Sequence, residues 1–240
     1  MKIAVISPTV PKSIRSLIQP EDYFIIAVDA AVEAIVEQGM DYQMAVGDFD
    51  SLNEPSLLHG EVIRLNPIKD DSDTAKALEI AFGMSNDVIL IGGTSGARKD
   101  HFVANLMLLT QYPDLVMMDE YNQITIKSIG THKIEKKGYD YLSVFPIENS
   151  LITLTNVKYP LYQHQLNRLN PLGLSNEIDG VATLIVHEGK LLVFQSKEKS
   201  KKRRSALFFL SSCKCTFFKC TRRNFNLLNI TIFIYDSNGL

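Results

Sequence analysis

The chain has no tryptophan and only three cysteines among its 240 residues. The cysteines, Cys213, Cys215 and Cys220, lie in one basic segment, and an odd number without an accompanying histidine supports neither a disulfide framework nor a complete zinc site. No apolar run reaches the roughly 20 residues of a membrane-spanning helix. The segment 1–9 has no basic leader or cleavage pattern. These absences predict a cytoplasmic protein without a membrane segment.

Charge is nearly balanced in total but unevenly distributed. The formal net charge of -2 argues against a dedicated nucleic-acid binder. From residue 197 onward there are ten Lys and Arg and two acidic residues, which leaves fifteen basic and twenty-five acidic residues before that point. An acidic body of this kind binds an anionic nucleotide through a cation that it holds.

The first half of the chain alternates strand-like and helix-like segments. Short apolar runs predict strands, and apolar residues spaced three and four apart predict helices. Strands are expected at 2–7, 23–28, 42–46, 61–65, 87–91 and 115–118, with helices at 30–38, 73–82 and 101–110. This alternation predicts a Rossmann-like α/β domain with a parallel sheet over residues 1–122.

The pattern changes after residue 123 to successive strand-like runs without long helices. These runs are rich in Val, Ile, Leu, Phe and Tyr and lie at 124–128, 141–146, 150–155, 182–188 and 190–196. They predict a smaller all-β, sandwich-like domain over residues 123–196. A single Rossmann-like domain with a β extension is the alternative.

Acidic residues gather where predicted strands end and helices begin. Asp48 and Asp50 lie in VGDFDSL, Asp70 and Asp73 in KDDSDTAKAL, and Asp100 in GGTSGARKDHF. Open α/β sheets bind ligands at this end of their strands, and carboxylates are the ligands that Mg²⁺ prefers. Each aspartate alone could simply cap a helix or stabilise a turn. Their recurrence at comparable junctions favours a shared metal site.

The glycine-rich segment 92–96 follows an apolar strand and precedes a helix. Its backbone can approach a phosphate closely, and the helix N-terminus supplies N–H donors. The segment lacks both the Walker A ending and the GxGxxG spacing, so a tight turn is the competing interpretation. Arg98 favours phosphate binding, since a guanidinium binds two oxygens with directed donors.

Taken together, these motifs resemble the thiamin pyrophosphokinase family, which transfers a pyrophosphoryl group from ATP to the hydroxyl of thiamin. The resemblance rests on VDAA at 28–31, GDFDS at 47–51, DDSD at 70–73, GGTSGARKDH at 92–101 and LSNE at 174–177. The resemblance covers roughly the first four fifths of the chain, a length that is about the usual size of the family's proteins. The sequence departs from the family pattern at Ala30, Ala31, Ser72 and Ala97, and in having no Trp to stack on thiamin.

The resemblance implies a role for individual residues. Magnesium would be held by Asp48, Asp50 and Asp73. Catalysis would involve Asp70, Asp100 and Arg98. ATP would be bound by Asp29, Ser51, Gly92, Thr94, Arg98 and His101. Thiamin would be bound by Asp29, Asp100, Ser175 and Asn176. The resemblance also implies a homodimer, with each thiamin site assembled across subunits.

Phosphoryl chemistry then gives a mechanism in which the protein mainly positions reactants and neutralises charge. The thiamin hydroxyl attacks the β-phosphorus, AMP departs, and Arg98 stabilises charge on the nucleotide. Asp70 or Asp100 orients the attacking hydroxyl or takes its proton.

Two other functions fit part of the pattern. A sugar-nucleotide glycosyltransferase also carries a DxD pair on a Rossmann-like sheet, but gives no reason for Arg98, Asp100 and the LSNE element. A noncatalytic protein that senses thiamin or nucleotide would bind its ligand without releasing AMP.

The segment 197–240 has a different composition and extends past the resemblance. Its KEKSKKRR run could form a basic arm for nucleic acid or acidic lipid. Its apolar half shows no periodicity that would bury it, so a nonhomologous extension is the favoured interpretation. For the chain as a whole, the predicted partners are ATP and thiamin, and neither nucleic acid nor a membrane is expected as a partner.

Overall fold

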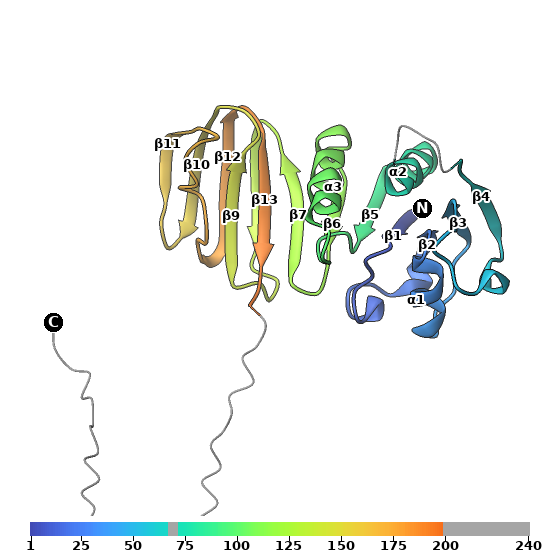
Figure 1. Ribbon diagram of the computed structural model, residues 1–240. Helices are drawn as coiled ribbons and strands as arrows, with labels where there is room; N and C mark the ends of the chain where they lie inside the picture. Colours follow the sequence, from blue (N-terminus) through green and yellow to red (C-terminus); the bar gives the residue numbers. More distant parts are fainter. Residues whose placement is uncertain (67–71, 199–240) are drawn as a thin grey trace, which may run out of the picture. The chain divides into compact units, whose positions relative to one another are not determined.

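The computed structural model describes residues 1–66 and 72–198, which form two β-sheets and three α-helices (Figure 1). Asp70, the three cysteines and residues 199–240 of the predicted extension lie outside the described residues. Within the described residues, no helix is long and apolar enough to span a membrane.

Six parallel strands form the first part of a nine-stranded sheet. They are β1 (Lys2–Ile6), β2 (Tyr23–Val28), β3 (Met44–Gly47), β4 (Glu61–Arg64), β5 (Asp87–Ile91) and β6 (Val116–Met118). In space they follow the order β4-β3-β2-β1-β5-β6, and each neighbouring pair is parallel. The order reverses between β1 and β5, and open α/β sheets bind ligands at such a switch point.

Helices cover both faces of these strands. They are α1 (Ala31–Glu37), α2 (Asp73–Met84) and α3 (Lys99–Gln111). Ile3 of β1 packs with Leu78 of α2 and Leu109 of α3, in one buried cluster. The next residue, Ala4, faces the other way and packs with Ile35 of α1. Because both faces are covered, the central strands consist almost wholly of apolar residues.

Helix α2 begins with a capped turn. The Ser72 hydroxyl oxygen accepts a hydrogen bond from the Ala75 backbone N–H at 3.2 Å, so this serine is the N-cap. Asp73 follows in the first turn, where unpaired N–H groups stabilise a negative charge. The cap therefore fixes the position of Asp73 at the start of the helix.

The antiparallel part continues the same sheet and adds a second one. Strands β7 (Asn122–Lys127), β13 (Leu191–Ser196) and β9 (Tyr141–Pro146) extend the first sheet beyond β6. The second sheet has the order β11 (Leu161–Leu166), β10 (Ser150–Val157), β12 (Ile178–Glu188) and β8 (Gly130–Glu135). Val144 and Val193 of the first sheet share a buried core with Leu154 and Leu184 of the second. The predicted fold class, a mostly parallel α/β part followed by an antiparallel β part, is confirmed.

Candidate functional site

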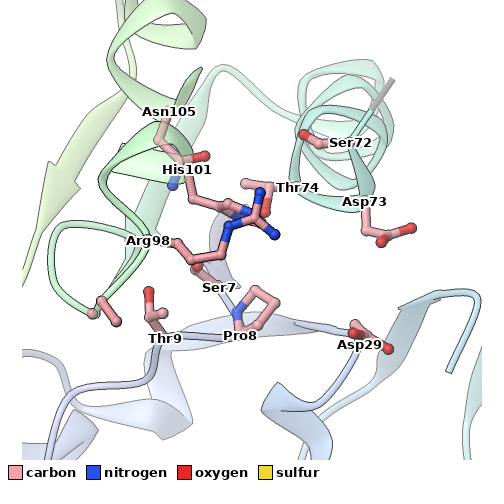
Figure 2. Close-up of a pocket in the computed structure, with 12 residues that line it drawn as sticks. Ser7, Pro8, Thr9, Asp29, Ser72, Asp73, Thr74, Arg98, His101 and Asn105 are labelled. Carbon is pink, nitrogen blue, oxygen red and sulfur yellow. The ribbon is translucent and has the colours of Figure 1, made fainter. Parts of the chain in front are cut away.

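A cavity of about 480 Å³ opens beside the carboxyl ends of the parallel strands (Figure 2). Its walls come from the segment after β1, the end of β2, the start of α2, and the glycine-rich loop with α3. The lining residues are Ser7, Pro8, Thr9, Asp29, Ser72, Asp73, Thr74, Gly96, Ala97, Arg98, His101 and Asn105. Elements far apart in sequence therefore converge at the switch point between β1 and β5.

The glycine-rich loop is held close to the segment after β1. The Gly93 backbone N–H donates to the Thr9 hydroxyl at 2.9 Å, and Asn105 Nδ2 donates to the Gly93 carbonyl at 3.1 Å. Gly92 and Gly93 have φ values of 86° and 72°. A Cβ at Gly92 would clash with the Thr9 carbonyl, and one at Gly93 with the Asn105 amide. Only glycine satisfies both the backbone angle and the close approach.

Thr94 of the same loop is tied to the sheet. Its hydroxyl donates to Oδ2 of Asp119, a carboxylate that is only 6% exposed. Oδ1 of Asp119 accepts from the backbone N–H groups of Tyr121 at 2.6 Å and Asn122 at 2.7 Å. Thr94 does not line the cavity, so its hydroxyl stabilises the loop through Asp119 rather than through a contact in the cavity. Sequence reasoning missed Asp119, although it follows a predicted strand as Asp29 does.

Carboxylates gather at one side of the cavity. Oxygens of Asp29, Asp48 and Asp50 all lie within 4.8 Å of one another. The Asp48 charge, followed by burial and the charges of Asp29 and Asp73, raises the pKa of Asp50. Figure 2 shows Asp29 and Asp73 at the same side of the cavity. Four carboxylates from three strand-to-helix junctions thus repel one another, which is the arrangement that a bound cation stabilises.

Asp29 has an unusual environment within this cluster. Its Oδ2 accepts a hydrogen bond from the Ser51 hydroxyl at 2.8 Å. Its Oδ1 is buried and has no hydrogen-bond partner among the described residues. Its φ of 48° lies in the left-handed region that non-glycine residues seldom adopt. A buried carboxylate oxygen that accepts no hydrogen bond is suited to binding a cation.

Arg98 and Asp100 form an exposed ion pair at the start of α3. The guanidinium Nε donates to Oδ1 of Asp100 at 3.2 Å, and a terminal nitrogen donates to Oδ2. This pairing lowers the pKa of Asp100 to about 2. Arg98 lines the cavity and extends into it in Figure 2, next to His101. Asp100 is not among the lining residues and keeps its negative charge at any physiological pH.

Comparisons with known proteins find relatives of this chain over most of its length. The family model for the catalytic domain of thiamin pyrophosphokinase matches residues 15–119, and that for its vitamin B1 binding domain matches residues 131–191. Thiamine pyrophosphokinase of Bacillus subtilis is 30% identical over 186 residues, covering 72% of this chain and 87% of that relative. The chain belongs to the thiamin pyrophosphokinase family.

Solved structures of the family share the fold. The crystal structure of the Bacillus subtilis thiamine pyrophosphokinase superposes with a TM-score of 0.75 at 25% identity, covering 83% of this chain and 100% of that one. The structure from Geobacillus thermodenitrificans gives a TM-score of 0.74 at 28% identity, with coverages of 83% and 99%. The match extends over both parts of the described fold.

The late Ser-Asn element of the family lies in the antiparallel part of the chain. The Ser175 backbone N–H donates to the Ser143 hydroxyl at 2.9 Å, and Ser175 has a φ of 58°. Asn176 is 7% exposed, and its side chain bonds both the N–H and the carbonyl of Tyr159, at 3.0 and 2.8 Å. Neither residue lines the cavity. Asn176 therefore fixes the backbone that carries the exposed Tyr159.

The structure brings only some of the predicted site residues together. Asp29, Asp73, Arg98 and His101 line the cavity. Asp48, Asp50 and Ser51 join it through the carboxylate cluster and Asp29. Gly92, Thr94, Asp100, Ser175 and Asn176 are not among the lining residues, and Asp70 lies outside the described residues. Sequence reasoning missed Ser7, Pro8, Thr9 and Asn105, which carry no motif of their own.

Proposed function

We propose that this chain transfers the pyrophosphoryl group of ATP to the hydroxyl of thiamin, giving thiamin diphosphate and AMP. The observation that carries the proposal is the convergence of the acidic cluster and Arg98 on one cavity, in a chain of the thiamin pyrophosphokinase family. Residues 1–122 form the ATP- and metal-binding part. Residues 123–196 form the thiamin-binding and dimerisation part.

The residues of the cluster fit a magnesium ion. Every candidate ligand is a carboxylate, the donor that Mg²⁺ prefers, and Asp29 Oδ1 is buried without a donor among the described residues. Asp48, Asp50 and Asp73 would hold the ion, with Asp29 adjoining them. An ion bound there would neutralise charge on the transferring phosphate oxygens. Ser51 keeps Asp29 turned toward the cluster through their hydrogen bond.

ATP occupies the cavity beside the glycine-rich loop. The turn at Gly92 and Gly93 brings Gly96 and Ala97 of the loop to the cavity wall, where a phosphate can approach the backbone closely, and the N-terminus of α3 adds positive potential. Thr94 holds this loop through Asp119. Arg98 and His101 supply side-chain donors to the nucleotide from one turn of helix. Arg98 gives two of its five N–H donors to Asp100, which leaves others for a phosphate oxygen.

Asp100 orients the attacking hydroxyl. While Arg98 pairs with it, the pKa of this carboxyl is lowered to about 2, which makes it a weak base. Such a carboxylate still accepts a hydrogen bond from the thiamin hydroxyl. A loose phosphoryl-transfer transition state needs little help from a base, so orientation suffices. Asp70 is the other candidate for orienting the hydroxyl or taking its proton.

Thiamin binds where a second copy of the chain brings Ser175 and Asn176 near the cavity. In one chain these residues lie in the antiparallel part and do not line the cavity. Asn176 holds Tyr159, whose side chain is 61% exposed. An exposed ring on a fixed backbone suits stacking against an aromatic ligand. Tyr159 thereby takes the place of the missing tryptophan in a homodimeric enzyme.

The test incubates the full-length protein with ATP, MgCl₂ and thiamin, and follows AMP and thiamin diphosphate together by chromatography. Equimolar, thiamin-dependent formation of both products is the expected result. ADP with thiamin monophosphate would instead mean transfer of a single phosphoryl group. Folded protein that binds thiamin but releases no AMP would contradict the enzymatic function.

A further inference from the structure

The carboxylate of Glu33 receives three hydrogen bonds from two consecutive residues of another segment. Oε1 accepts from the backbone N–H of Asn53 at 2.6 Å and from that of Glu54 at 3.0 Å. Oε2 accepts from Asn53 Nδ2 at 3.0 Å. The Glu54 N–H, followed by the Asn53 side chain, lowers the pKa of Glu33. Helix α1 thus holds the segment 53–54 through one ionised side chain.

The segment that Glu33 holds is the end of the loop that carries two members of the carboxylate cluster. This loop leaves β3 at Gly47, presents Asp48 and Asp50, and reaches Asn53 three residues later. Its beginning is fixed differently, because the Phe49 side chain is buried with the Arg64 guanidinium 5.4 Å from the ring centroid. Glu33 therefore fixes the far end of a loop whose near end is already packed.

When no cation is bound, the carboxylates of the loop repel each other and that of Asp29. Three carboxylates with oxygens within 4.8 Å of one another favour separation, and Asp50 is the exposed member of the three. Hydrogen bonds within the loop and to Asp29 oppose this separation. The Asp50 N–H donates to Asp48 Oδ1 at 3.2 Å, and Ser51 bonds Asp29. At the end of the loop, Leu52 is buried, and the three bonds to Glu33 hold the next two residues.

We infer that Glu33 is a positioning residue for the cation: it holds Asp48 and Asp50 in their binding arrangement before the cation arrives. Glu33 does not belong to the group of convergent carboxylates, and both its oxygens already accept hydrogen bonds. It acts on affinity through preorganisation, since a loop that is ordered in advance loses less entropy on binding. This inference rests on the proposed function, because that function supplies the cation.

The test measures binding of Mn²⁺ alone to the nucleotide-free, full-length protein by isothermal titration calorimetry. Outer partners of metal ligands typically change affinity 10- to 100-fold when mutated, so Glu33→Ala should raise the dissociation constant for Mn²⁺ by about tenfold. Glu37→Ala is the matched control, since Glu37 is an exposed residue of the same helix, and it should leave binding unchanged. Thermal unfolding in EDTA records any loss of stability separately.

Glu33→Gln keeps the inference testable if the alanine variant fails to fold. The Gln oxygen still accepts from both backbone N–H groups, while its amide nitrogen faces the Asn53 amide without an acceptor. Its affinity for Mn²⁺ should lie between those of the wild type and Glu33→Ala. In turnover assays, Glu33→Gln should raise the Mg²⁺ concentration for half-maximal rate and leave the rate at saturating Mg²⁺ nearly unchanged.

The outcomes separate this inference from the proposed function. A wild type that forms thiamin diphosphate and binds Mn²⁺, with Glu33 variants that bind it equally well, would overturn the positioning role alone. A lower unfolding temperature without a change in Mn²⁺ affinity would assign Glu33 a purely structural role and also overturn it. A wild type that binds no Mn²⁺ would overturn both the cation site and the inference.

Discussion

The Thr94 hydroxyl donates a hydrogen bond to Asp119, and this bond joins the glycine-rich loop to the end of β6. Asp119 is buried and also accepts from two backbone N–H groups. We expect Asp119→Ala to lower the free energy of unfolding by about 3 kcal/mol, because it leaves several buried donors without an acceptor. Urea denaturation measures this. Asp22→Ala removes an exposed acid and should change stability by less than about 0.5 kcal/mol. Equal effects of both substitutions would contradict the role of Asp119.

Gly93→Ala should weaken both folding and ATP binding. The new methyl group would clash with the Asn105 amide, at a backbone φ of 72° that alanine disfavours. A loss of at least about 1 kcal/mol in stability follows from the backbone conformation alone. Gly83→Ala is the control, because a methyl group at Gly83 in α2 would meet nothing within 4 Å outside its own stretch of helix. That variant should gain about 0.5 to 1 kcal/mol. Urea denaturation and ATP calorimetry of both variants check the contrast.

Asp48→Asn and Asp73→Asn should abolish turnover while the fold stays intact. Each removes one charge from the cluster that holds Mg²⁺ in the proposed function, so the rate should fall by more than about 100-fold. Circular dichroism tests the fold, and thiamin diphosphate formation tests the rate. MgCl₂ should raise the unfolding temperature of the wild type, and EDTA should reverse this rise. Folded Asp48→Asn protein that keeps a near-normal rate would refute the metal assignment.

The pair formed by His59 and Asp41 predicts a pH dependence of stability. His59 Nδ1 lies 2.8 Å from the Leu57 carbonyl and Nε2 lies 2.6 Å from Asp41. The carbonyl first, and then Asp41, raises the pKa of His59, whereas the bond from His59 lowers the pKa of Asp41. The His59 contribution is present below its unfolded pKa and is lost as pH rises through the folded one. The Asp41 contribution is present above its unfolded pKa and is lost as pH falls.

The pair should therefore contribute most between about pH 4 and pH 6.5, the ordinary pKa values of the two groups. Both side chains are substantially exposed, so the contribution is small, about 0.5 kcal/mol. Urea denaturation of the wild type and of His59→Gln at about pH 5.5 and pH 9 measures it. The difference between the two proteins should shrink at the higher pH. A difference that grows with pH would show that the imidazole is bound in its neutral form.

How far the sequence predicts this fold depends on where each strand lies. The central strands β1 and β5 are buried on both faces, and their continuous apolar runs identify them within a residue or two. Strands β8 and β11 escaped prediction because they are edge strands with mostly polar side chains and one fully buried residue each, Ile134 and Leu166. The pairing of β6 with β7 makes the first sheet continuous, but no local pattern in the sequence indicates it.

The residues of the site also differ in how well the sequence predicts them. Asp48 and Asp50 carry a local signal, because they follow a strand whose carboxyl end meets those of its parallel neighbours at one edge of the sheet. Asp29 was expected only as an ATP or thiamin contact, and its place beside these two carboxylates is seen in the structure. Glu33 looks like an ordinary residue of a helix surface, and Asn105 like a polar position within a helix. The role of Glu33 depends on Asn53 and Glu54, and that of Asn105 on Gly93, all of which lie in distant segments. Only the tertiary structure brings such partners together.

Tyr159→Ala should raise the KM for thiamin by about tenfold and leave the KM for ATP unchanged, since an aromatic pair contributes about 0.5 to 1.5 kcal/mol beyond its buried area. Tyr159→Phe keeps the ring and should retain the wild-type KM. Tyr162→Ala is the matched control, because Tyr162 is also exposed and lies on the neighbouring strand β11. Steady-state rates at varied thiamin and fixed, saturating ATP measure all three variants. Equal KM values for Tyr159→Ala and Tyr162→Ala would remove Tyr159 from the thiamin site and leave Ser175 and Asn176 as the proposed contacts.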